Sequence, residues 1–164
     1  MISVYGSSGF VGSRFCNLYP DFVLKQGREE RKPRSKDILY LISTVDNYNI
    51  HSNITLDVET NLKVLCEVLD HCRDNEITFN FVSSWFVYGE SDLPAKEDYH
   101  CNPTGFYSIT KKAAEDLLIS FCKTYDIFDD YAKYIMSGNV ILYRECEKFE
   151  NYNKELADKF KKMI

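Results

Sequence analysis

The sequence lacks the patterns that bind structural metals or cross a membrane. Its six cysteines include no CxxC pair and its three histidines are dispersed, so no complete set of metal ligands is evident. We therefore expect no metal site and reduced core thiols. No apolar run approaches the roughly 20 residues that span a bilayer. The sequence enters a strand-like segment directly at Met1 without a signal peptide, and we expect a cytoplasmic protein.

The sequence also lacks an excess of positive charge. With 20 Lys and Arg against 25 Asp and Glu, its formal charge is −5, which opposes general binding to nucleic acid or anionic lipid. A small anionic ligand that local groups hold is still allowed. The length of 164 residues and the hydrophobic content of 45% fit one domain with a sizeable core.

Short apolar strands and amphipathic helices alternate along the chain. Continuous apolar runs, as parallel strands covered on both faces require, predict strands at residues 1–5, 22–24, 38–42 and 79–82. Helical spacing predicts helices at residues 10–18, 56–73 and 104–125, and the polar stretch 150–164 is typical of a helix. This alternation predicts an α/β fold, a Rossmann-type doubly wound parallel sheet in three layers.

The segment 25–36 interrupts this alternation. It is polar and contains the six cations Lys25, Arg28, Arg31, Lys32, Arg34 and Lys36. Because it is barely long enough for the usual crossover helix, we expect a helix and a strand common in such folds to be missing. The sheet would then have a reduced number of strands.

A glycine-rich turn follows the first predicted strand. Gly6, Gly9 and Gly12 have the spacing G-x-x-G-x-x-G at the start of a predicted helix. Glycines there let the backbone approach a pyrophosphate, and the helix amino terminus supplies amide donors. This context favours phosphate binding, although a purely structural turn is the alternative.

The residues after the second strand address the choice between NAD and NADP. An acid about 20 residues beyond the glycines is typical of NAD binding, and an arginine is typical of NADP binding. Lys25 and Arg28 occupy this neighbourhood, with no acid at the strand end, which favours NADP over NAD. Two alternatives stay open: a merely solvated loop, or contact of Glu29 and Glu30 with a ribose.

Candidate acid/base residues lie in the second half of the chain. Ser83 and Ser84 end the fourth predicted strand, where a hydroxyl can hydrogen-bond a substrate oxygen or simply cap the strand. Tyr107 and Lys111 are four residues apart, so in a helix they share a face and the lysine charge favours the phenolate. Alone, this spacing also fits an ordinary amphipathic helix with a surface lysine.

Taken in order, these motifs resemble the extended short-chain dehydrogenase/reductase family, specifically nucleotide-sugar epimerases, dehydratases and reductases. The resemblance covers residues 1–125 and also includes the strand at 37–42, Asn61, the Val87-Tyr88-Gly89 run and Pro103. It implies that Tyr107 is the acid/base, that Lys111 lowers its pKa and holds the nicotinamide ribose, and that Ser84 orients the reacting oxygen. The implied cofactor-binding residues are Gly6, Ser8, Gly9, Phe10, Val11, Gly12, Arg28, Ser43, Thr44, Asn61, Tyr107 and Lys111.

The resemblance also implies a reaction class. The family's dehydratases have an Asp-Glu pair just after the hydroxyl residue, whereas this chain has Trp85 and Phe86 there. Dehydration is therefore disfavoured, which leaves epimerisation or carbonyl reduction of a nucleotide-sugar with NADP or NAD. In the family, helices corresponding to residues 54–74 and 104–125 often pair in a dimer, so the resemblance also implies a homodimer.

The sequence departs from the family pattern toward its end. The resemblance implies an Arg-x-x-Asn-Val-x-Gly segment, but residues 136–142 lack both its arginine and its last glycine. We expect an NAD(P)-binding domain at residues 1–142 and a helical extension at 143–164 in place of the usual substrate domain. This departure supports a second hypothesis, a truncated, non-catalytic NAD(P)-binding or protein-interaction relative.

Overall fold

The computed structural model describes residues 1–45, 51–73, 77–90, 99–125, 131–137, 140–144 and 154–163. Strands and helices alternate through this part of the chain. Their order is β1 (Ile2–Tyr5), α1 (Phe10–Leu18), β2 (Val23–Lys25), β3 (Asp37–Tyr40), α2 (Leu56–Val58), a π-helical segment (Glu59–Lys63), α3 (Val64–Asp70), β4 (Thr78–Ser84), a 3-10 helix (Trp85–Tyr88), α4 (Phe106–Thr124), β5 (Tyr131–Ser137), β6 (Val140–Arg144) and α5 (Lys154–Met163).

The strands form one sheet. Among the described residues it has six strands in the order β2-β1-β3-β4-β5-β6. The pairs from β2 to β5 are parallel, which confirms the predicted Rossmann-type α/β fold. The last pair, β5 with β6, is antiparallel, so residues 136, 137 and 140–142 belong to an antiparallel pair that the sequence analysis did not predict.

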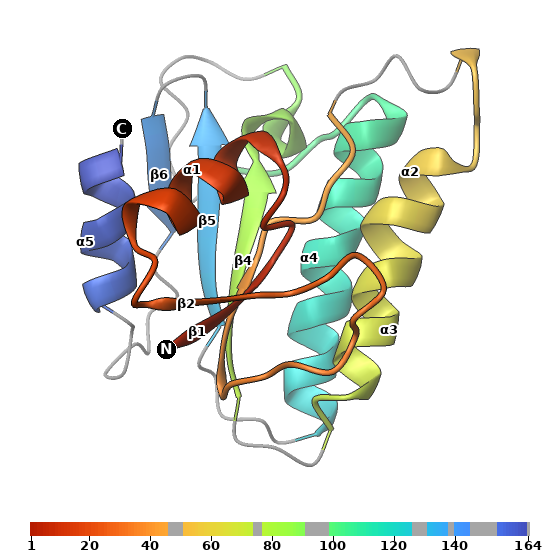
Figure 1. Cartoon of the computed structure of the whole chain (residues 1–164). Helices are drawn as coiled ribbons and strands as arrows, with labels where there is room; N and C mark the ends of the chain where they lie inside the picture. The colour runs from red at the N-terminus through yellow and green to blue at the C-terminus, as the bar shows by residue number, and fades with distance from the viewer. Residues whose placement is uncertain are drawn as a thin grey trace.

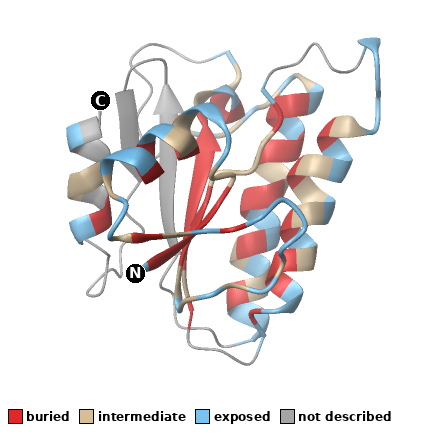
Figure 2. Ribbon diagram, viewed as in Figure 1, coloured by how far each residue is buried: buried red, intermediate tan, exposed pale blue. Residues whose placement is uncertain are grey.

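Helices cover both faces of the sheet, as expected for three layers (Figure 1). On one face, strand residues such as Ile2, Val4 and Leu39 pack with α1 and with Leu156 of α5. On the other face, a larger apolar cluster joins β3 and β4 to α3 and α4. Figure 2 shows buried residues along the central strands and on the inner sides of these helices. The strands are apolar on both faces because helices or loops cover both.

The connection between β2 and β3, residues 26–36, contains neither a helix nor a strand. The sequence analysis expected this for residues 25–36, but Lys25 is the last residue of β2. In the common Rossmann order, a third strand lies outside the second, whereas here β2 is the edge strand. The connection is held to β1 by side chains: the Tyr5 hydroxyl donates to the Arg31 carbonyl oxygen at 2.6 Å, and Ser3 accepts from the Arg34 amide at 2.9 Å. Burial raises the pKa of Tyr5 to about 12, so this phenol stays protonated as a donor near neutral pH.

The C-terminal helix packs on the first helix. The Tyr19 hydroxyl donates to the Lys159 carbonyl oxygen at 3.0 Å, and the Lys159 ammonium lies over the rings of Tyr19 and Phe22. Leu156 is fully buried in the shared core. The predicted domain boundary between residues 142 and 143 falls within β6, and the division of the chain into two parts stays a prediction.

Candidate active site

Glycines let α1 approach the end of β1 closely. Gly6 has φ +78°, a left-handed conformation that side chains other than glycine rarely adopt. A Cβ atom on Gly12 would collide with the Gly6 carbonyl oxygen, and the Gly9 amide donates to that same oxygen at 3.0 Å. The spacing of the glycines therefore corresponds to a real backbone contact between strand and helix.

The amino terminus of α1 is open to solvent. Gly9 is its extended N-cap residue, and Phe10, the first helical residue, is 92% exposed. Ser8 is exposed and Val11 is partly buried. Because the first amides of a helix have no intrahelical acceptor, this end can bind an anion.

A buried polar network joins the end of β3 to α4. The Asn61 Oδ1 atom accepts from the Thr44 amide at 2.9 Å, and its Nδ2 group donates to the hydroxyls of Thr44 and Thr110 at 3.0 and 2.9 Å. Asn61 is 2% exposed and lies in the π-helical segment, a kind of local distortion often found at functional sites. The Ser43 hydroxyl beside Thr44 is buried without a hydrogen-bond partner among the described residues.

Two serines end β4. Ser84 is 5% exposed, and its Oγ atom accepts from the Phe86 amide at 3.3 Å, which caps the following 3-10 helix. Ser83 is 4% exposed, and its hydroxyl donates to the Glu115 carboxylate of α4 in a short hydrogen bond. The sequence analysis named a cap of the strand as one alternative for Ser84, whereas the structure shows a cap of the 3-10 helix that follows.

Tyr107 and Lys111 lie on the buried face of α4. Tyr107 is 9% exposed, and its ring makes an edge contact with Phe86 at 6.1 Å between centroids. Lys111 is 2% exposed; its ammonium donates to the Val82 carbonyl oxygen at 2.8 Å and lies 4.2 Å from the centre of the Phe81 ring. The lysine is thus a buried cation against β4 rather than a surface residue.

The fold brings these candidates to one edge of the sheet. The glycine turn, Ser43 and Thr44, and Ser84 follow or end the parallel strands β1, β3 and β4, whose carboxyl ends lie at the same edge. Residues of α4 contact both the Asn61 network and β4. A shared edge of this kind is where doubly wound sheets bind ligands.

Arg28 lies apart from these groups, in the exposed turn after β2. Its carbonyl oxygen accepts from the Arg31 guanidinium at 2.6 Å, and Glu67 accepts from Arg31 Nε at 2.6 Å. The hydrogen bond from Arg31 lowers the pKa of the Glu67 carboxyl group. The Arg31 charge is therefore compensated, and Arg28 presents its cation to solvent.

Comparison with protein families identifies the chain. Residues 31–158 match the model of the NAD dependent epimerase/dehydratase family. The chain belongs to this family. The glycine turn precedes the matched range, whereas Asn61, Ser84, Tyr107 and Lys111 lie within it.

Solved structures of similar fold include two proteins named as 4-epimerases. The chain resembles the UDP-N-acetylglucosamine 4-epimerase of Methanobrevibacter ruminantium M1 in complex with UDP-N-acetylmuramic acid (TM-score 0.69, 19% identity, 92% of this chain and 58% of that chain). It also resembles the UDP-glucuronic acid 4-epimerase of Bacillus cereus with UDP-glucuronic acid and NAD (0.66, 19%, 82% and 55%). A third structure is RMD of Pseudomonas aeruginosa with NADPH (0.66, 21%, 82% and 50%).

These matches show the shared fold, and they do not extend over the whole of the other proteins. This epimerase/dehydratase family member spans between 50% and 58% of the length of these three structures. No curated protein sequence matches the chain significantly.

The sequence analysis of this family member missed two residues that the structure brings to the site. Thr110 completes the Asn61 network, and Glu115 holds Ser83. Their positions three and eight residues after Tyr107 place them near or on the same helix face. Helical spacing was therefore the available signal, but a threonine and a glutamate at such positions also fit an ordinary solvated helix.

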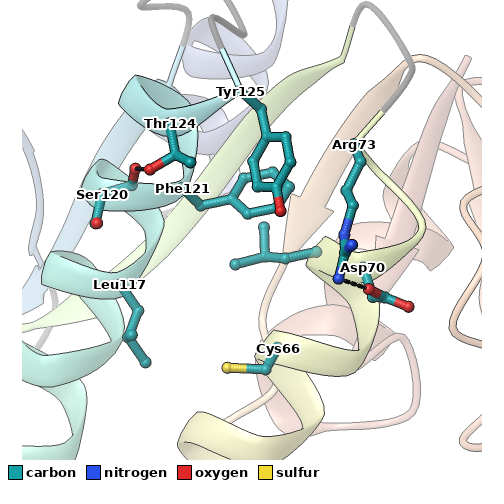
Figure 3. A pocket seen from close by; sticks show the side chains of 9 residues that line it. Cys66, Asp70, Arg73, Leu117, Ser120, Phe121, Thr124 and Tyr125 are labelled. Atoms are coloured by element: carbon teal, nitrogen blue, oxygen red, sulfur yellow. Dashed lines mark hydrogen bonds and ion pairs between the residues drawn. The ribbon is translucent and has the colours of Figure 1, made fainter.

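A hollow of about 280 Å³ lies elsewhere, between α3 and α4 (Figure 3). Arg73 forms an ion pair with Asp70 on one side, and the Phe121 and Tyr125 rings lie 4.7 Å apart on the other. Cys66 and Leu117 line its end toward the middle of the two helices. This hollow belongs to the outer face of the helix pair, and none of the predicted site residues lines it.

Within the described ranges of the chain, no group of three or more His, Cys, Asp or Glu side chains is arranged to hold a metal ion. The helices within those ranges are too short or too polar to traverse a bilayer.

The Asn61 network gives a testable consequence for stability. We expect Asn61→Ala to lower the free energy of unfolding by about 1–3 kcal/mol, because it leaves the buried Thr44 amide without its acceptor. Asn17→Ala, at an exposed position of α1, is the matched control and should change the free energy of unfolding by less than about 0.5 kcal/mol. Urea denaturation measures both. Equal stabilities would show that the network does not hold β3 to α4.

Proposed function

We propose that the chain is an NAD(P)-dependent epimerase or reductase that acts on a nucleotide-sugar by hydride transfer. The observation that carries this proposal is the placement of Tyr107, Lys111 and Ser84 beside the sheet edge that also carries the glycine turn, in a member of the epimerase/dehydratase family. Tyr107 is the proposed acid/base, and Ser84 orients the reacting oxygen. Lys111 supplies a positive charge on the same helix face.

The residues around the glycine turn fit a dinucleotide. The close contact between Gly12 and Gly6 leaves the backbone bare of side chains at the open amino terminus of α1, as a pyrophosphate requires. The unpartnered Ser43 hydroxyl offers a further polar group near Thr44. In the proposal, Gly6, Ser8, Gly9, Phe10, Val11 and Gly12 hold the phosphates, and Ser43, Thr44, Asn61, Tyr107 and Lys111 line the remaining groove.

The chemistry divides between the cofactor and the chain. A nicotinamide, when bound, accepts or donates the hydride. The chain's own contribution is proton transfer and orientation: the Tyr107 hydroxyl exchanges a proton with a substrate oxygen that Ser84 holds by a hydrogen bond. Since Asn61 uses both Nδ2 hydrogens within the protein, its proposed role is to place Thr44 and α4 around the groove.

We also propose a preference for NADP over NAD. The exposed Arg28 and Lys25 lie just after and at the end of β2, where the adenosine ribose is read in such folds. Among similar structures, six contain NAD and one contains NADPH, so both cofactors occur among proteins of this fold. The local cations favour the additional phosphate of NADP.

A second function is supported by one observation of the structure. The Lys111 ammonium is buried against the Val82 carbonyl oxygen and the Phe81 ring, where it holds α4 against β4. This contact favours a non-catalytic NAD(P)-binding or protein-interaction relative. A cytoplasmic location and the division into residues 1–142 and 143–164 belong to both proposals.

Removing the Tyr107 hydroxyl tests the proposed enzyme. Nicotinamide fluorescence should show binding of NADPH or NADH to the full chain, and a screen of UDP-hexoses should show turnover. We expect Tyr107→Phe to lower turnover by about 100-fold or more, because it removes the proton donor, while the cofactor Kd changes little. Tyr125→Phe, near the far end of α4 and 41% exposed, is the matched control.

The outcomes separate the two functions. Failure of both cofactors to bind at millimolar concentration rejects both. Binding without turnover on any nucleotide-sugar supports the non-catalytic relative. Turnover that is unchanged in Tyr107→Phe refutes the acid/base role of Tyr107.

The cofactor preference has its own test. We expect Arg28→Ala to raise the Kd for NADPH about tenfold or more and to leave the Kd for NADH nearly unchanged, because the arginine contacts only the additional phosphate. Arg73→Ala, beyond the end of α3 and paired with Asp70, controls for the general loss of a cation. Equal weakening of both cofactors by Arg28→Ala would remove the NADP preference.

Pairing of two chains through residues 54–74 and 104–125 is a further part of the proposal. Along the outer face of these helices, Val58 is 46%, Ile109 49% and Leu117 39% exposed. The hollow in Figure 3 adjoins Leu117. Because α3 and α4 cover the sheet with their other faces, this apolar surface is available to a second copy, as in a four-helix interface.

Charge at this surface should abolish a dimer. We expect light scattering to give twice the 19.2 kDa chain mass for the natural protein and a single chain mass for Ile109→Asp and Leu117→Asp, because a buried unpaired carboxylate opposes association. Leu18→Asp, on α1 and 49% exposed, is the control. A natural protein that is monomeric at all concentrations contradicts the pairing.

A further inference from the structure

Glu115 shares the buried face of α4 with the two proposed site residues of this helix. Tyr107, Lys111 and Glu115 follow one another at intervals of four residues, so they lie on one side of the helix. Glu115 is only 3% exposed. Glutamate is almost never fully buried unless it is paired, so its partner on β4 indicates what the residue does.

One partner of Glu115 is the residue next to Ser84. The Ser83 hydroxyl donates to Glu115 Oε1, and both groups are buried. Ser84 has an extended backbone, with φ −136° and ψ 144°, and successive strand residues point to opposite sides. A fixed Ser83 side chain therefore fixes the direction in which the Ser84 hydroxyl leaves the strand.

A second contact acts on the preceding residue. Lys111 Nζ donates to the Val82 carbonyl oxygen at 2.8 Å. Val82, Ser83 and Ser84 are consecutive, so one cation and one carboxylate from a single helix face hold the last residues of β4. Of these two contacts, that of Lys111 is to the backbone of the strand, and that of Glu115 is to a side chain beside Ser84.

We propose that Glu115 is a positioning residue that, through Ser83, sets the place of the Ser84 hydroxyl relative to Tyr107. This inference rests on the proposed function, since it concerns two groups that act on the same substrate oxygen. A displacement of about 1 Å at a reacting group can lower a rate about 100-fold. A change in the distance between β4 and α4 at this point is therefore expected to change the reaction rate.

The kinetic test compares variants that break or keep the hydrogen bond. Glu115→Ala and Ser83→Ala should each lower kcat about 10- to 100-fold with the KM and the cofactor Kd little changed, because the loss is one of alignment. Glu115→Gln keeps an acceptor oxygen and Ser83→Thr keeps the hydroxyl, so both should retain most of the activity. The Ser83→Ala/Glu115→Ala double variant should be no slower than the slower single variant.

A matched control and a second readout separate this inference from the proposed function. Asp116→Ala removes the neighbouring carboxylate, which is exposed and pairs with Lys112 at 2.5 Å, and should leave kcat unchanged. Amide hydrogen exchange of residues 84–88 does not require turnover. It should accelerate about tenfold or more in Ser83→Ala and Glu115→Ala, and it should not change in Asp116→Ala, Glu115→Gln or Ser83→Thr.

Each outcome then decides a separate question. If the natural protein shows no turnover but exchange is faster in Ser83→Ala and Glu115→Ala, the anchoring of Ser84 is supported and the proposed enzyme is rejected. Unchanged exchange, or faster exchange with an unchanged kcat in an active protein, overturns the positioning role. Should Glu115→Ala fail to fold, the Ser83→Ala/Glu115→Gln variant removes the hydrogen bond without leaving a buried carboxylate and is measured in its place.

Discussion

The contact between the buried face of α4 and the end of β4 is the constraint on which the candidate site depends. It places a phenol, an ammonium and a carboxyl group, those of Tyr107, Lys111 and Glu115, against a parallel sheet. Charged groups are expensive to remove from water unless they find partners, and the Val82 carbonyl and Ser83 hydroxyl are those partners. The same contacts that make this burial tolerable also hold the two residues before Ser84 against the helix.

The two halves of the proposed groove are joined by a single amide side chain. Asn61 bonds to Thr44, which follows β3, and to Thr110, which lies between Tyr107 and Lys111. On the other side of the sheet edge, the contact between Gly6 and Gly12 sets how closely α1 approaches β1. The proposed phosphate-binding and acid/base parts of the site are therefore built on strand ends and on α1 and α4 rather than on long loops.

The sheet departs from the common doubly wound form at both edges. On one side, an ordered connection replaces a helix and a strand, and it is held by side chains of β1 and by the pair between Arg31 and Glu67. On the other side, β6 is antiparallel. The central strands β1, β3 and β4, which carry the candidate site, keep their parallel order. The departures at the two edges therefore leave the strands of the candidate site in their usual arrangement.

The sequence by itself determined the Rossmann-type fold and the bounds of α1, and it located the strands that carry the candidate site, because apolar runs and glycine spacing are local signals. It also indicated the missing helix and strand in the segment 25–36, since length alone limits what such a segment can form. Only the tertiary structure decided that Asn61 bonds to Thr110, that Ser83 meets Glu115 and that Lys111 is buried against Val82. These partners are 29 to 49 residues apart in the chain, and the antiparallel pairing of β6 likewise depends on packing rather than on local pattern. Contacts of this range depend on how helices and strands pack, which no local sequence pattern specifies.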